Sequence, residues 1–214
     1  MITKIGPSCN KNYVLNYSFN SAIIEAILVM LEGYHSCEKN AGANEACDKK
    51  SYSYLIFQCI RQYQIPADHY FSSQKAVEKW NELTSENIND FPGFKDTFTC
   101  EKVKGNPVHY LKYTGSKKTG EPAEAKEGDS PIKFNDVFHY DHIVPVSLIF
   151  QTIIDLNDPD YDAVKEILEK MYVCRLLKEE DRKLSRTKGR TMDFRQVIRD
   201  LYAPKGIIIK DFHE

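Results

Sequence analysis

The stretch from Phe138 to Pro145 constrains the fold of this chain more than any other part. It reads Phe-His-Tyr-Asp-His-Ile-Val-Pro, so a β-prone segment ends in an acid and an imidazole and then meets a proline. Proline lacks a backbone N–H and fixes φ, so it cannot continue a central strand. The sequence therefore predicts a strand over residues 132–143 that stops at this proline and has Asp141 and His142 near its end.

A second strand and a basic helix are predicted later in the chain, over residues 172–177 and 178–188. The helix begins with Glu179 and Glu180, whose negative charges suit the positive N-terminal end of a helix, and basic residues follow them. Gly189 then closes the helix, because glycine is the usual residue just past a helix end. The order of elements is thus strand, strand, helix.

Most of the remaining chain has the hydrophobic spacing of helices. This spacing predicts helices over residues 21–33, 51–63, 72–85, 163–171 and 193–202, with an apolar run at 147–156 and a closing strand at 207–209. For 51–63 a strand is the alternative, and the helical spacing of Leu55, Cys59 and Tyr63 favours the helix.

Turn signals predict where helices end and where the chain reverses. Gly33 is expected near the C-terminal end of the first helix. Residues 36–50 and 114–131 are polar and predict loops. Two β-rich runs within 97–113 flank a Gly-Asn-Pro turn and predict a hairpin.

These elements together predict an α+β fold with two regions. At 214 residues, of which 42% are hydrophobic and 28% charged, the chain can bury a sizeable core. Residues 1–131 are expected to form a helical region with the hairpin, a candidate for target recognition. Residues 132–214 are expected to form a strand–strand–helix module that carries an insertion at 148–171.

No part of the chain is expected to cross a membrane. The most apolar run, residues 22–31, is too short and too interrupted to span a bilayer, and no signal-peptide pattern precedes it. The six cysteines are scattered and form no Cys-x-x-Cys pair, which is typical of reduced thiols. The sequence therefore predicts a cytoplasmic protein.

Charge is distributed unevenly along the chain. The net charge is −2, yet residues 172–210 contain eleven Lys and Arg against five Asp and Glu. A basic segment beside an acidic body is expected where one face meets phosphates. A solvated helix surface explains the charge alone equally well.

The acids and the imidazole have the chemistry needed to cleave a phosphodiester bond. That reaction requires an activated water and compensation of the charge on the phosphorane and the leaving oxygen. Imidazole titrates near neutrality, so His142 is the candidate general base. Asp141 and Asp181 are the candidate ligands of one divalent ion, Mg²⁺ or Mn²⁺, because both ions favour carboxylate oxygens.

Neighbouring side chains are further candidates. His139 falls on the same strand face as Asp141, so it could be an extra metal ligand, although a packed or hydrogen-bonded histidine is favoured. The candidates for contacts with flanking phosphates are Arg175, Arg182, Lys183 and Arg186. An Asp-His pair alone is typical of a surface turn, and Asp181 alone is as compatible with an ion pair on a helix surface. The proline and the later acidic helix together favour a site.

The two motifs together resemble the HNH endonucleases, also called the ββα-metal or His-Me finger family. Asp-His-Ile-Val-Pro at 141–145 is similar to the end of the family's first strand, and Lys-Glu-Glu-Asp-Arg-Lys-Leu-Ser at 178–185 to its helix. The resemblance covers roughly residues 132–190. Where the family has Asn or His on the helix, this chain has Asp181, and Tyr172 lies nearest the place of the family's middle Asn.

The resemblance implies a ββα-metal module and a divalent-metal-dependent endonuclease that hydrolyses DNA, with restriction or defence as its expected setting. DNA is then the expected partner, and a homodimer is a further option. One alternative is a non-catalytic nucleic-acid-binding protein with a degenerate HNH module, which the replaced middle Asn favours. Another is that the acidic N-terminal half docks a protein partner while the module is a structural core.

Overall fold

The computed structural model describes residues 11–39, 45–83, 88, 98–103, 106–111, 134–210 and 212. It has the mixed α+β fold that the sequence predicts and divides into two compact units. Unit 1 comprises residues 1–65 and 146–171, and unit 2 comprises residues 66–145 and 172–214. The expected division after residue 131 differs from these boundaries, and the segment expected to be an insertion, 148–171, belongs to unit 1.

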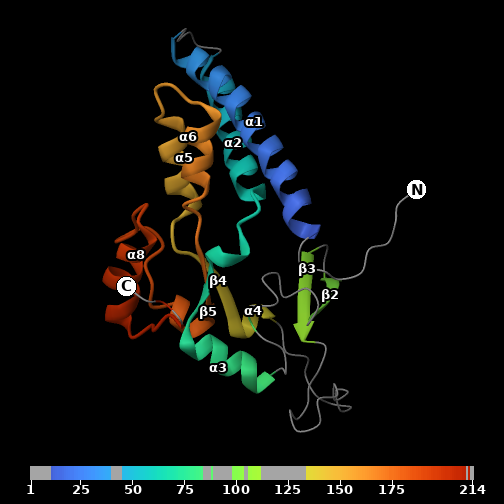
Figure 1. The fold of residues 1–214 in the computed structure, drawn as a ribbon, viewed down its shortest axis with the longest axis vertical. Helices are drawn as coiled ribbons and strands as arrows, with labels where there is room; N and C mark the ends of the chain where they lie inside the picture. The colour runs from blue at the N-terminus through green and yellow to red at the C-terminus, as the bar shows by residue number, and fades with distance from the viewer. Residues whose placement is uncertain are drawn as a thin grey trace, which may run out of the picture. The chain divides into compact units, whose positions relative to one another are not determined.

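Unit 1 is built from helices (Figure 1). α1 (Lys11–Lys39) packs along α2 (Glu45–Gln62), while α5 (Val146–Ile154) and α6 (Tyr161–Leu168) complete the unit. Its core contains Ile24, Ile27, Leu31, Ile56, Ile60, Ile149, Ile153, Val164 and Leu168. Full burial of such a side chain contributes roughly 1.5–3 kcal/mol, so the apolar faces stabilise helices that would be marginal alone.

Gly33 lies inside α1, and the prediction that it marks the helix end is wrong. A Cβ atom at Gly33 would meet the ring of Tyr52 on α2, with separations of 2.4, 2.5 and 2.8 Å to its Cζ, Cε1 and Oη atoms. The glycine therefore lets the two helices approach closely. The helix predicted over 21–33 is correct in type and too short at both ends.

α2 confirms the helical interpretation of residues 51–63. The predicted loop over 36–50 is wrong for residues 36–39 and 45–50, which are helical, while 40–44 lie outside the described residues. Glu, Ala and Lys are favourable in helices, so a polar composition did not oppose helix formation there.

The apolar run at 147–156 forms most of α5, and the helix predicted at 163–171 is α6. α6 begins two residues before Ala163, whose N–H donates a 2.7 Å hydrogen bond to the Asp160 side chain. Asp160 is thus the N-cap that sets the start of the helix.

Unit 2 contains a three-stranded sheet in the order β1–β5–β4. β4 (Phe138–His142) pairs antiparallel with β5 (Val173–Leu177), and β1 (Tyr70–Ser72) pairs parallel with the other edge of β5. Tyr70 follows a 3₁₀ turn, η1 (Ala67–His69). The prediction of a second strand at 172–177 is confirmed.

One face of the sheet packs on α3 (Gln74–Leu83), which confirms the helix predicted over 72–85. Trp80 is fully buried, and its ring meets that of Phe138 edge-on, with 5.8 Å between the centroids. The N–H of Ala76 donates a 3.1 Å hydrogen bond to the Ser73 hydroxyl, which caps the helix.

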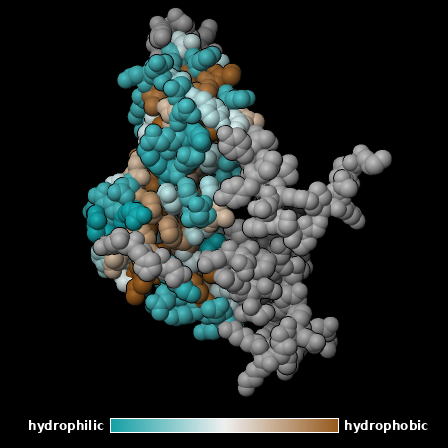
Figure 2. All heavy atoms as spheres, viewed as in Figure 1, coloured by the Kyte–Doolittle hydropathy of each residue, from teal (hydrophilic) through white to brown (hydrophobic). Residues whose placement is uncertain are grey.

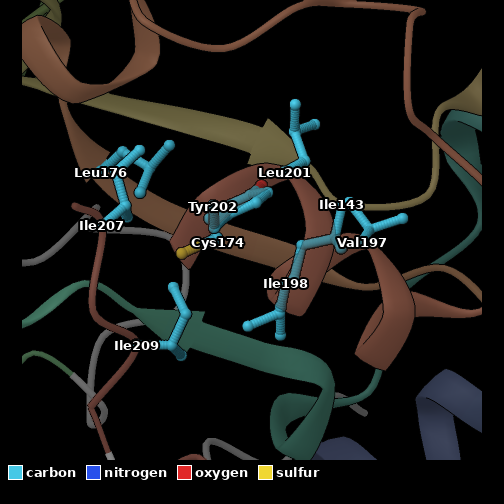
Figure 3. Packing of buried hydrophobic residues seen from close by; sticks show 9 residues of the cluster. All are labelled: Ile143, Cys174, Leu176, Val197, Ile198, Leu201, Tyr202, Ile207 and Ile209. Atoms are coloured by element: carbon cyan, nitrogen blue, oxygen red, sulfur yellow. The ribbon is translucent and has the colours of Figure 1, made fainter. Parts of the chain in front are cut away.

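The other face packs on the C-terminal segment, which consists of α8 (Phe194–Val197), a π-helical turn η2 (Ile198–Tyr202) and a 3₁₀ turn η3 (Ala203–Lys205). The helix predicted over 193–202 is confirmed in type. Figure 3 shows the nine side chains of this core cluster: Ile143, Cys174, Leu176, Val197, Ile198, Leu201, Tyr202, Ile207 and Ile209. Burial raises the pKa of the Cys174 thiol well above its usual value, so this cysteine behaves as a neutral core residue.

The predicted hairpin is confirmed. β2 (Phe98–Val103) pairs antiparallel with β3 (Asn106–Leu111), in a register that places Phe98 opposite Leu111. It forms a sheet of two strands, separate from the sheet that contains β4. The long loop predicted over 114–131 lies outside the described residues.

Three predicted elements are corrected. Residues within 132–143 do not form one strand, because α4 (Phe134–Val137) precedes β4. The helix predicted over 178–188 is only α7 (Lys178–Asp181), since the Ser185 hydroxyl accepts hydrogen bonds from the N–H groups of Thr187 and Lys188 and stabilises a turn. The closing strand at 207–209 is reduced to one bridge between Ile209 and Ser73.

Hydrophilic side chains cover most of the described surface seen in Figure 2, and hydrophobic ones show in small separate areas. Among the described side chains, the exposed large hydrophobic ones are Phe19, Val29, Tyr54, Leu55 and Ile208. Among the helices that the structure describes, none combines the length and the apolar character that a bilayer span requires. Cys37, Cys59 and Cys174 are free thiols.

Candidate functional site

The candidate site lies in unit 2, where β4, β5 and α7 are in contact. β4 ends at His142, the chain returns as β5, and α7 follows β5 without a gap. In the antiparallel register Asp141 is opposite Cys174, and His142 is opposite Val173. Segments distant in sequence therefore lie together: β4 and β5 are side by side (Figure 1), and α7 is in contact with both.

His142 is the last residue of β4 and is half-buried. Because side chains alternate along a strand, His142 lies on the opposite face from Asp141 and His139. The next residue, Ile143, donates its N–H to the carbonyl oxygen of Tyr172 over 2.9 Å. This bond keeps the end of β4 beside the start of β5.

Tyr172 contributes to this end of the sheet through its ring as well. Its ring lies between those of His69 and Phe194, with centroid distances of 4.1 and 3.9 Å and nearly parallel planes. Tyr172 is therefore a stacked aromatic residue whose backbone carbonyl holds the strand end. Such packing supplies rigidity that a loop alone lacks.

Asp141 forms a buried ion pair with Arg190. Nη1 of Arg190 is 2.8 Å from Oδ2 of Asp141, and Nη2 is 3.1 Å from Oδ1, so the contact is bidentate. The Arg190 side chain is 2% exposed and that of Asp141 is 13% exposed. The hydroxyl of Tyr202 donates a further hydrogen bond to Oδ2.

The contacts among Asp141, Arg190 and Tyr202 determine which of these side chains are charged. Burial alone would lower the pKa of Arg190, but the hydrogen bonds and charge of Asp141 outweigh it, and the net pKa is raised. Burial, together with the charge and hydrogen bond of Asp141, raises the pKa of the Tyr202 hydroxyl. The tyrosine is therefore a neutral donor, and the guanidinium and carboxylate form a charged pair.

Asp181, the last residue of α7, lies beside His139 of β4. Nε2 of His139 is 3.7 Å from Oδ1 of Asp181, and the side chains are 47% and 24% exposed respectively. The structure thus brings together two of the three predicted metal ligands at the surface. The third, Asp141, is engaged with Arg190.

The basic residues predicted to contact phosphates fall into two groups. Arg182, Lys183 and Arg186 are exposed on the turn that follows α7. Arg175, by contrast, is 1% exposed, and its Nη1 donates a 2.9 Å hydrogen bond to the Ser72 hydroxyl. Its guanidinium also lies 5.3 Å from the centre of the Tyr70 ring. Burial in the sheet removes Arg175 from the surface that could meet a phosphate.

Several residues of the site are not evident from the sequence. Arg190 and Tyr202 bind Asp141 from 49 and 61 residues later in the chain, and Ser73 binds Glu180 from 107 residues earlier. No local pattern links such positions. The one available sequence signal for the contact of Glu180 was the pair of glutamates before Asp181. Glu180 is the buried member of this pair, and Glu179 is exposed.

A divalent ion fits part of this residue set. Mg²⁺ and Mn²⁺ need few protein ligands, because they keep waters and take oxygens from substrate phosphates. Asp181, with His139 beside it, can provide such ligands at the surface. Asp141 does not fit, since both of its oxygens already accept hydrogen bonds from a cation. Within the described residues no three His, Cys, Asp or Glu side chains converge as a metal site.

Comparisons of the chain with known protein families, curated proteins and solved structures gave no match.

Proposed function

We propose that the protein is a divalent-metal-dependent endonuclease of the HNH type that hydrolyses DNA phosphodiester bonds and acts in restriction or defence. One observation carries the proposal: an antiparallel strand pair runs directly into a short helix, with His142 at the end of the first strand and Asp181 on the helix. The preference for DNA rests on the sequence resemblance, while the residues support phosphodiester hydrolysis in general.

In the proposed reaction His142 takes the proton from the water that attacks phosphorus, which is the role of a general base. Because its side chain lies on the opposite face of β4 from His139, this role requires the end of the strand to turn the imidazole toward the ion. Arg182 and Lys183, exposed beside Asp181, bind the phosphates that flank the scissile bond and orient the strand. Asp181 and His139 would hold the divalent ion. When bound, that ion would supply charge compensation at the phosphate and the leaving oxygen.

Nicking of supercoiled plasmid DNA by the full chain, with Mg²⁺ or Mn²⁺ added, tests this function. Removal of a general base typically lowers the rate by about 10²–10⁴-fold, and we expect His142→Ala to lose activity within this range. His35→Ala is the matched control, since His35 is a half-buried histidine of unit 1, outside the candidate site. Full activity in His142→Ala, or no nicking by the wild type with either ion, would contradict the proposal.

The second candidate is a nucleic-acid-binding protein without catalytic activity. The Asp141–Arg190 ion pair favours it, because it engages a carboxylate that the resemblance assigns to the metal. Such a protein would bind DNA with a strong salt dependence, without a need for divalent ions, and would leave the plasmid intact.

A further inference from the structure

We infer that Asp141 is not a metal ligand but an anchor, which acts with Arg190 to position the His142 end of β4 against the basic turn that follows α7. The inference rests on the proposed function for the role of His142. The contacts of one buried guanidinium carry it.

Arg190 donates hydrogen bonds to two separate parts of the chain. Its Nη1 bonds to the carbonyl oxygens of His142 and Ile143, at 2.8 and 3.3 Å, in addition to the Asp141 carboxylate. Its Nε donates to the carbonyl oxygen of Ser185 at 3.1 Å. A single side chain therefore ties the end of β4 to the turn.

The turn over residues 185–189 reverses the chain, so that Arg190 reaches this position. The hydroxyl of Ser185 accepts a 2.9 Å hydrogen bond from the N–H of Lys188, and Gly189 has a φ of 80°, in the region that favours glycine. The exposed residues Arg186 and Lys188 lie on this turn. Because the guanidinium holds the turn and β4 together, the spacing between these cations and His142 is set by Arg190.

Asp141 completes the anchor and is unsuited to hold a cation. Its two oxygens accept from Arg190, and Oδ2 also accepts from Tyr202, so a metal ion would have to displace a bidentate, nearly buried guanidinium. Displacement would leave that positive charge buried without a partner, which is strongly unfavourable. Asp181 and His139 are the pair to which an ion has open access.

Mn²⁺ binding to the full chain, measured by calorimetry and by electron paramagnetic resonance, separates the two roles of the carboxylates. We expect Asp181→Asn to weaken Mn²⁺ binding about tenfold or more, since a carboxylate ligand is lost. Asp141→Asn combined with Arg190→Gln should bind Mn²⁺ within about threefold of the wild type. The double variant removes both charges together, so no unpaired ion remains in the core.

Hydrogen exchange tests the positioning role without any catalytic readout. The Ile143 N–H, which bonds to Tyr172, should exchange about tenfold faster or more in the double variant, because the end of β4 has lost its anchor. The Val77 N–H, which bonds to Ser73 in α3, should change much less. Where plasmid nicking occurs, kcat should fall about tenfold or more while KM for DNA changes less than threefold.

The matched control neutralises another Arg–Asp pair of unit 2. Arg199 and Asp200 lie 3.1 Å apart but are 59% and 49% exposed, so Arg199→Gln with Asp200→Asn should leave Mn²⁺ binding, Ile143 exchange and kcat unchanged.

The outcomes separate this inference from the proposed function. A tenfold loss of Mn²⁺ affinity in the folded double variant, or unchanged Ile143 exchange, would overturn the anchor even if the wild type cleaves DNA. If Mn²⁺ binding and exchange behave as expected but the wild type does not nick DNA, the anchor role is supported and the proposed nuclease function is contradicted. A wild type that binds no Mn²⁺ would overturn the assignment of Asp181 and His139.

Discussion

The hydroxyl of Ser73 donates a 2.6 Å hydrogen bond to Oε2 of Glu180, a carboxylate that is 1% exposed. The same hydroxyl accepts from the N–H of Ala76, and the same carboxylate oxygen accepts from the N–H of Leu177 over 3.0 Å. One hydrogen bond therefore joins the N-terminal ends of α3 and α7 through the core of unit 2, and it fixes where the helix that carries Asp181 begins.

Ser73→Ala should destabilise the protein by about 1–3 kcal/mol, because it removes a helix cap and one donor to a buried carboxylate. Chemical denaturation followed by circular dichroism measures the change. The control is Glu78→Gln, which changes an exposed carboxylate on α3 that accepts from Gln74 and should cost less than about 0.5 kcal/mol. Equal stability of Ser73→Ala and wild type would show that the bond contributes nothing.

Gly33→Ala should destabilise unit 1 by about 1 kcal/mol. Without a close neighbour the same change would be favourable, because alanine is preferred over glycine inside a helix by about 1 kcal/mol. The added methyl group would lie 2.4 Å from the Tyr52 ring and must displace it. In a Tyr52→Ala background the obstacle is gone, and the same substitution should stabilise by up to about 1 kcal/mol. A double-mutant cycle of denaturation measurements gives the coupling, and a coupling energy near zero would contradict the close packing of α1 and α2.

Stability should fall at alkaline pH partly through Tyr63. Burial, and then the negative charges of Glu169 and Tyr161, raises the pKa of Tyr63 to about 12 from its ordinary value of 10. Below about pH 10 both states hold the proton and the stabilisation is complete; between about pH 10 and 12 only the unfolded chain ionises, so stability is lost. The loss attributable to this residue should reach about 2 kcal/mol.

Urea denaturation between about pH 8 and 12 isolates that loss as the difference between wild type and Tyr63→Phe. The other buried tyrosines contribute equally to both proteins and cancel. Tyr54→Phe serves as the control, since Tyr54 is exposed on α2, which ends just before Tyr63, and it should keep the wild-type pH dependence. A Tyr63→Phe protein as sensitive to alkali as the wild type would disprove the assignment.

Neutralising Arg182, Lys183 and Arg186 together to Gln should weaken DNA binding and lower its salt dependence. Each lost phosphate contact reduces the magnitude of the slope of log K against log salt by about 0.9. The slope of the triple variant should therefore be smaller in magnitude by up to about 2.7. The three residues are exposed, so thermal stability should change little. Fluorescence anisotropy over a salt series measures the slope.

The matched control removes three positive charges from unit 1, through Arg61→Gln, Lys165→Gln and Lys170→Gln. All three side chains belong to unit 1, whereas the candidate site belongs to unit 2, and the two lysines form ion pairs along α6 and its end. If both triple variants reduce the slope equally, the attraction is a property of net charge and not of the turn after α7.

The sequence alone determined the elements whose signals are local. Proline at 145 and the β-prone residues before it predicted β4, and glycine, asparagine and proline around 106 predicted the hairpin. Helical spacing of apolar residues identified α2, α3 and α6. These signals are reliable because each rests on backbone geometry or on a repeat within one element.

Tertiary structure decided the features that depend on residues far apart in the chain. It placed Gly33 against Tyr52 inside a helix, shortened α7 to one turn, buried Arg175 and paired Asp141 with Arg190. The physical reason is that a carboxylate at a strand end has the same local sequence whether it faces water, a metal or a guanidinium. Only the return of the chain through Ser185 and Gly189 brings Arg190 to Asp141, and that return is a property of the folded unit.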